Sequence, residues 1–157
     1  MTSKFRFVAL KKEQFDSYME LSDEELAIHH AKWMIVDKEP GYPCRVSLED
    51  AKIGERVLFI PYWHHDVQSA YRAMGTILVR ERARNTQFEV NQVPTMLHHR
   101  FLSVKVYDSS NMMIAHDLAK GSELEVKLRS QFQNPNAAYI HLHYASPGCF
   151  CSAVYRA

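Results

Sequence analysis

The stretch FLSVKVYDSSNMMIAHDL, residues 101–118, carries the pattern that decides the fold. Its first half alternates, with Leu102, Val104 and Val106 on one side of an extended chain and polar side chains between them. Such alternation is typical of a half-buried strand. The run Asp108-Ser109-Ser110-Asn111 then favours a turn, so we expect an antiparallel hairpin over residues 101–118.

The rest of the chain supplies further short elements of the same kind. Strands are expected at residues 5–10, 56–63, 75–82, 139–144 and 149–155, with an extended segment at 33–36. Pro61 interrupts the second of these and favours a bulge or an edge position there. With about three short helices, the pattern predicts an α+β fold. We expect a single globular domain over residues 1–157, built on a largely antiparallel sheet of about seven strands.

Two capping boxes predict where helices begin. Ser22 with Glu25 predicts a helix of about nine residues from Asp23, and Ser122 with Glu125 predicts one starting near Glu123. The apolar residues that face inward in this scheme should meet in one contiguous core. They are Leu58, Ile60, Leu102, Val104, Val106, Leu124 and Leu128.

Composition and charge exclude several classes of function. Lys and Arg number 19 against 18 Asp and Glu, a formal charge of +1, so no global field attracts nucleic acid or anionic lipid. No apolar run is long enough for a signal peptide or a membrane span. Three cysteines cannot all pair within one chain, and no Asn-x-Ser/Thr acceptor occurs, which favours the cytoplasm.

Several familiar catalytic motifs are missing as well. No two glycines lie closer than thirteen residues apart, which excludes a dinucleotide fingerprint and a P-loop. The chain also has no nucleophile elbow, H-E-x-x-H, C-x-x-C or EF-hand loop. Six of the nine histidines form adjacent pairs at 29–30, 64–65 and 98–99. Neighbours on a strand point to opposite faces, so we interpret these pairs as surface or half-buried residues rather than chelators.

The C-terminal segment is more specific. In a strand over 139–144, Tyr139, His141 and His143 share one face. Cys149 and Cys151 share a face of the following strand, and the loop between the strands decides whether that face is the same. A three-residue loop places His143 opposite Cys151, whereas a two-residue Pro-Gly loop places both cysteines on the other face.

The first outcome offers His141, His143, Cys149 and Cys151 as four ligands for a structural zinc ion. The second leaves a buried cluster of aromatic and thiol groups and no metal or other cofactor.

A second stretch with chemical potential is Gly41-Tyr42-Pro43-Cys44-Arg45. Gly41, Pro43 and the preceding Pro40 hold a loop that presents a thiol beside a guanidinium, which lowers a thiol pKa and attracts anions. The alternative is a buried cysteine in a rigid loop, with Arg45 paired to Glu49 or Asp50.

These motifs resemble the domain of unknown function 1203 family, which is mostly bacterial and has no established activity. The matching segments are 41–51, Gly54-Glu55, 69–75, 100–107, His143, Gly148-Cys149 and Arg156. Thr76 and Tyr144 depart from the family pattern, where Pro and Asn are common. The resemblance covers the chain from about residue 25 to its end and implies no mechanism.

Two functional hypotheses follow from these residues. The first is a domain that binds a small ligand or performs thiol-dependent catalysis, with Cys44, His143 and Cys149 as catalytic residues and Arg45, His141 and Tyr139 binding the ligand. The second is a non-enzymatic domain that binds another protein or forms a homodimer, with no nucleic-acid or membrane partner. Whether the protein is an enzyme stays open at this point.

Overall fold

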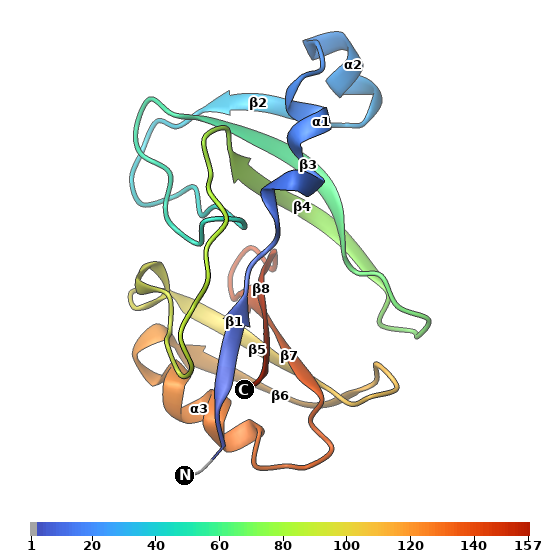
Figure 1. Ribbon diagram of the computed structural model, residues 1–157, viewed down its shortest axis with the longest axis vertical. Coiled ribbons are helices and arrows are strands. Elements are labelled where there is room, and N and C mark those ends of the chain that lie inside the picture. The colour runs from blue at the N-terminus through green and yellow to red at the C-terminus, as the bar shows by residue number, and fades with distance from the viewer. Residues whose placement is uncertain (1–2) are drawn as a thin grey trace.

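The computed structural model describes residues 3–157 and shows an α+β protein with eight strands in two antiparallel sheets (Figure 1). The strands are β1 (Phe5–Val8), β2 (Lys32–Ile35), β3 (Arg56–His65), β4 (Ala73–Arg80), β5 (Phe101–Tyr107), β6 (Met113–Lys120), β7 (Tyr139–Tyr144) and β8 (Phe150–Arg156). The α-helices are α1 (Asp16–Met19), α2 (Asp23–Ile28) and α3 (Leu124–Gln131). Single 3₁₀ turns occupy Lys12–Gln14, Thr95–Leu97 and Gly121–Glu123.

The larger sheet has the order β1-β8-β7-β5-β6. The predicted hairpin of residues 101–118 is confirmed as β5 and β6, which pair from Phe101 opposite Lys120 to Tyr107 opposite Met113. Strand β5 also pairs with β7, so that Val104 lies opposite Leu142. The N-terminal strand β1 closes the other edge by pairing with β8.

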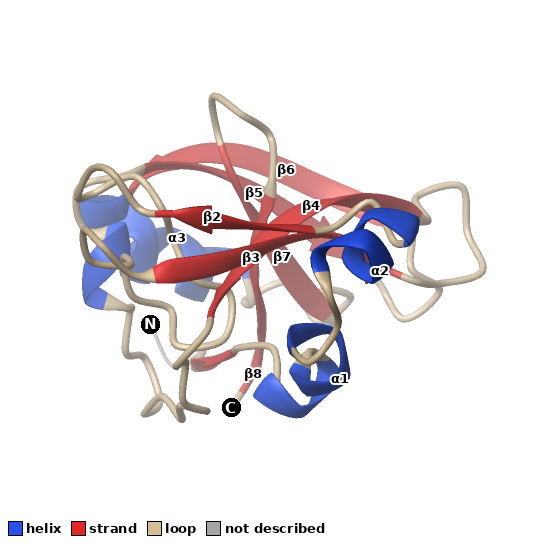
Figure 2. Ribbon diagram, turned by 90° about the horizontal axis from the view of Figure 1, so that it is seen from above, coloured by secondary structure: helices blue, strands red, loops and turns tan. Residues whose placement is uncertain are grey.

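The smaller sheet has the order β2-β3-β4 and is formed by the middle of the chain. It lies above the larger sheet in Figure 1, and the view from above in Figure 2 shows its strands crossing over those below. A register shift between Tyr62 and His65 interrupts the β3–β4 ladder. The bulge predicted from Pro61 therefore occurs just after the proline.

The apolar residues form two cores, one on each sheet, rather than the single core expected. Leu102, Val104 and Val106 of β5 pack with Leu124 and Leu128 of α3. Leu58 and Ile60 belong to a separate cluster between the small sheet, α2 and the loop before β3. The expectation of one contiguous core was wrong, because the chain divides its strands between two sheets.

Both helices begin within one residue of the predicted positions, at Asp23 and Leu124, but only the first capping box forms. The Ser22 hydroxyl accepts the Glu25 amide at 3.2 Å and the Glu25 carboxylate accepts the Ser22 amide at 3.1 Å. The helix spans six residues rather than nine, since His30 adopts φ 59°, a left-handed conformation that ends helices. At the second site Ser122 lies inside a 3₁₀ turn, and the Glu123 carboxylate accepts the Lys120 amide at 3.4 Å instead.

Candidate functional site

The site residues gather in the space between the two sheets. Period two on β7 places Tyr139, His141 and His143 on the sheet face opposite α3, as expected from the sequence. The β3 bulge brings His64 and His65 down onto that face. Phe150 of β8 completes the group, since its ring stacks on His64 at 5.3 Å and contacts His141 at 5.1 Å.

The loop between β7 and β8 directs the cysteines away from these histidines. Tyr144 bonds back to the Cys149 carbonyl at 2.9 Å, which leaves four residues in the connection. His143 lies opposite Phe150 and Leu142 opposite Ser152, so Cys151 is the extra residue of a bulge. Cys151 packs into the α3 core and Cys149 lies against it.

The four zinc ligands predicted at this hairpin are therefore not brought together. Cys149 and Cys151 lie on the Leu142 and Tyr144 face, while His141 and His143 lie on the other. The cysteine placement corresponds to the second of the two outcomes expected from the sequence, although it arises through a longer loop and a bulge.

A different set of three imidazoles does converge, which we call the histidine cluster: His64, His141 and His143. One ring nitrogen from each lies within 4.8 Å of those of the other two. The Nδ1 atoms of His64 and His141 are buried and have no hydrogen-bond partner among residues 3–157. His143 differs, because its Nδ1 donates to the Gly148 carbonyl at 2.9 Å and so leaves Nε2 with a free lone pair.

Burial keeps the cluster uncharged. It lowers the pKa of His64 to about 4, that of His141 to about 3 and that of His143 to about 4. Lys105, opposite His141 on β5, adds a positive charge that lowers the pKa of all three further. At neutral pH each of these rings is therefore uncharged, with one N–H group and one nitrogen lone pair.

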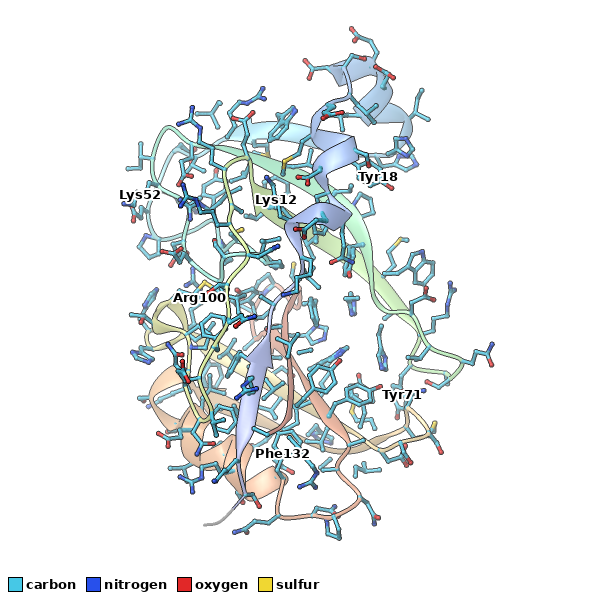
Figure 3. The ribbon with its side chains drawn as sticks, viewed as in Figure 1. Lys12, Tyr18, Lys52, Tyr71, Arg100 and Phe132 are labelled. Carbon is cyan, nitrogen blue, oxygen red and sulfur yellow. The ribbon has the colours of Figure 1, made fainter. Side chains whose placement is uncertain are left out.

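His65 and Tyr139 form a separate polar network beside the cluster. His65 is 3% exposed and its Nδ1 donates to the Tyr71 carbonyl at 2.8 Å. Its Nε2 lies 2.7 Å from the Tyr139 hydroxyl, which in turn bonds Asn111 at 2.7 Å. The Tyr139 hydroxyl thus connects the β3–β4 and β5–β6 hairpin ends, and Figure 3 shows Tyr71 at that end of the molecule.

Sequence reasoning missed His64 and His65. It interpreted the pair as surface or half-buried on opposite strand faces, whereas His65 is buried and both rings reach the inter-sheet space. The available signal was Pro61, because a bulge disrupts the alternation of side chains just where the histidines follow.

A cavity of about 540 Å³, here called the Arg45 cavity, opens near the other end of the inter-sheet space. It is lined by the loop before β3, by β4, by the start of β5 and by the β7–β8 loop. Most lining residues are apolar, among them Phe59, Ile77 and Phe101. Arg45, Arg100 and Cys149 supply polar groups, and Figure 3 labels Arg100 at this level of the molecule.

Arg45 is buried, 4% exposed, and pairs with neither Glu49 nor Asp50. Those carboxylates bond Arg80 and Arg100 instead. Arg45 Nε donates to the Phe150 carbonyl at 2.7 Å and Nη1 donates to the Pro43 carbonyl at 2.6 Å. The guanidinium also lies over the Tyr144 ring, 5.0 Å from its centroid, and no carboxylate forms an ion pair with Arg45 within residues 3–157.

The thiols differ in access. Cys44 is 0% exposed, and its Sγ accepts the amides of Ser47 at 3.5 Å and Arg80 at 3.4 Å. Burial raises the pKa of Cys151, which is 1% exposed. Cys149 is half-buried and lines the Arg45 cavity. The structure thus brings Arg45 and Cys149 to one cavity, and leaves Cys44 in the core of the small sheet.

Fold and site together define a two-sheet α+β protein with a ligand-sized cavity and a buried histidine cluster between its sheets. The chain belongs to the family described as Protein of unknown function (DUF1203), whose model matches residues 41–156. Arg45, Cys149 and the histidine cluster all lie in the matched part. No curated protein and no solved structure matches the chain. Among residues 3–157, no helix has the length and apolar character needed to cross a membrane.

Proposed function

We propose that this protein binds a small organic anion with an apolar body in the Arg45 cavity. The observation that carries the proposal is the buried guanidinium of Arg45, which contacts carbonyl oxygens and the Tyr144 ring but no carboxylate within residues 3–157. Burying a cation without a counter-charge is costly, and an anionic ligand relieves that cost. The bonds of Arg45 to the Phe150 and Pro43 carbonyls use two of the five N–H groups of a guanidinium, which leaves donors for a carboxylate.

The rest of the cavity selects the body of the ligand. Its volume of about 540 Å³ falls within the range typical of small-molecule sites. Phe59, Ile77 and Phe101 favour an aromatic or aliphatic group over a sugar or phosphate ester. A polar group at one end and apolar walls elsewhere is the usual way in which such sites orient a ligand.

A thiol reaction of the bound anion would use Cys149. Among the three cysteines it alone lines this cavity, whereas Cys44 and Cys151 are buried in the two cores. His143 contacts His64 and Phe150 on the opposite sheet face, so it is not placed as the base for that thiol. The three cysteines are all unpaired, which supports a reducing compartment such as the cytoplasm.

The test compares two probes that differ only in charge, 3-phenylpropanoate and 3-phenylpropanamide, by titration calorimetry. We expect the carboxylate to bind at least about tenfold more tightly to the native chain, a difference of about 1.4 kcal/mol. Arg45→Met should abolish that preference, while Arg84→Met, an exposed arginine outside the cavity, should keep it. Equal binding of the two probes to the native chain would contradict the proposal.

A second measurement on the unmodified protein covers the case in which Arg45→Met fails to fold. Iodoacetate and iodoacetamide alkylate the same thiol but differ in charge. Next to a guanidinium that has no carboxylate partner, the anionic reagent should be favoured. The iodoacetate rate divided by the iodoacetamide rate should therefore be larger at Cys149 than for glutathione. A ratio equal to that of glutathione argues against an anion site at Arg45. Peptide mass spectrometry separates Cys149 from Cys44 and Cys151, which should label only after unfolding.

A further inference from the structure

The histidine cluster shows features that packing alone does not explain. His141 and His143 project from one face of β7, and His64 approaches them from β3 in the other sheet. Nitrogen atoms of the three rings lie within 4.8 Å of one another. Ligand nitrogens of a tetrahedral zinc ion lie roughly 3.3 Å apart, given a Zn–N distance of about 2.05 Å. Small rotations of the rings would close that difference.

The hydrogen bonding of the cluster leaves ligand atoms free. The buried Nδ1 atoms of His64 and His141 have no partner, an arrangement that costs free energy in a folded protein. His143 is held by its Nδ1 bond to the Gly148 carbonyl. A metal-bound histidine commonly donates its second nitrogen to a carbonyl in this way, which orients the ring and strengthens its lone pair.

Neighbouring groups define the ligand set. His65 lies beside His141, but both its nitrogens are engaged with Tyr71 and Tyr139. Among residues 3–157, the potential metal ligands that converge at this point are three histidines, with no carboxylate or thiol. Three imidazoles favour zinc or a similar transition metal over magnesium or calcium, which prefer oxygen ligands.

We propose that His64, His141 and His143 bind a zinc ion and leave its fourth coordination position to water or a small anion. Three histidines with one open position match the ligand count of catalytic rather than structural zinc sites. Nearby Lys105 opposes binding of the cation but favours an anion in the fourth position. The proposal is independent of the Arg45 cavity, which lies elsewhere in the inter-sheet space and shares none of the three ligands.

The first experiment measures zinc binding directly. The purified chain is freed of metal with EDTA, the chelator is removed, and zinc is titrated in competition with a chromophoric chelator. We expect one tight site per chain. His64→Gln and His143→Gln should each weaken it by at least about 100-fold, whereas His116→Gln, an exposed histidine on β6, should leave it unchanged. Binding that survives His64→Gln at full strength would overturn the proposal.

The second experiment needs no variant. Cobalt replaces zinc in histidine sites, and four-coordinate cobalt absorbs visible light far more strongly than the hexaaqua ion. Titration of the native chain should give the strong spectrum at one equivalent, and zinc should displace it. A weak, six-coordinate spectrum would exclude the proposed geometry even if His64→Gln did not fold.

A third variant, Lys105→Gln, should strengthen zinc binding, whereas the histidine variants should weaken it. Removing the positive charge beside the cluster should tighten zinc binding by about three- to tenfold. Unchanged or weaker binding would place the metal away from this cluster.

Discussion

At the residue scale, burial decides the charge of the clustered histidines. The pKa of His64 falls to about 4, that of His141 to about 3 and that of His143 to about 4, mainly because the charged ring loses its hydration. Repulsion from Lys105 acts in the same direction, and His65 adds to it at His64 and His141. The native metal-free protein therefore holds three neutral rings where the unfolded chain would hold three titrating near 6.5.

This difference predicts acid sensitivity. Between about pH 6.5 and about pH 4 the unfolded state binds more protons than the native state, so the free energy of unfolding falls as the pH drops. Above about pH 7 the three imidazoles are neutral in both the native and the unfolded state, so this loss of stability disappears. Urea unfolding of the metal-free protein in EDTA, followed across this window, measures the effect. His141→Phe should make the dependence shallower, and a slope equal to that of the native chain would contradict the assignment.

At the scale of the element, both helices begin near the predicted positions, but only one of the two predicted capping boxes forms. Ser22 and Glu25 exchange hydrogen bonds, and those bonds lower the pKa of the Glu25 carboxyl. Ser122 and Glu125 have the same spacing, yet the chain enters α3 through a 3₁₀ turn. Gly121 helps to explain why, since a Cβ there would lie 1.6 Å from the Leu97 carbonyl oxygen. The packing of that turn against Leu97 fixes where the helix begins.

The pair of serines gives a matched comparison of stability. Ser22→Ala should lower the free energy of unfolding by about 1 kcal/mol, because the first turn of α2 loses its cap. Ser122→Ala should change it by less than about 0.5 kcal/mol, since that exposed hydroxyl caps no helix. Denaturant titrations of both variants measure the difference. A larger loss at Ser122 would mean that its hydroxyl does cap α3, as the sequence pattern predicts.

At the scale of the whole molecule, two sheets with separate cores enclose the polar residues between them. The α3 core lies on the far face of the larger sheet, while the other core covers the smaller sheet and its helices. The facing surfaces are therefore free to carry histidines, tyrosines and an arginine. Arg45 connects the two halves through its bond to the Phe150 carbonyl.

Separate cores predict additive mutational effects. Ile60→Val in the small-sheet core and Ile140→Val in the α3 core should each cost about 0.5–1.5 kcal/mol. Combined, they should add within about 0.5 kcal/mol, because the residues share no contacts. Ile140→Val with Val106→Ala, a directly opposed pair on β7 and β5, supplies the coupled control. Strong coupling between Ile60 and Ile140 would argue for one continuous core.

The sequence by itself determined the local structure and identified some of the residues at each site. Alternation located β5 and placed Tyr139, His141 and His143 on one face of β7, because strand periodicity depends only on neighbouring residues. The family pattern and the Arg45 loop likewise pointed to residues that line the cavity.

Only the tertiary structure decided which of these residues meet. The bulge at Cys151 and a four-residue loop turned the cysteines away from the histidines, and the β3 bulge brought His64 in their place. The carboxylates that one alternative assigned to Arg45 pair instead with Arg80, at the end of β4, and Arg100, just before β5. The placement of the cysteines, of His64 and of the carboxylates has the same physical reason. Register shifts and pairing between sheets depend on contacts between distant segments, and no local pattern of residues records them.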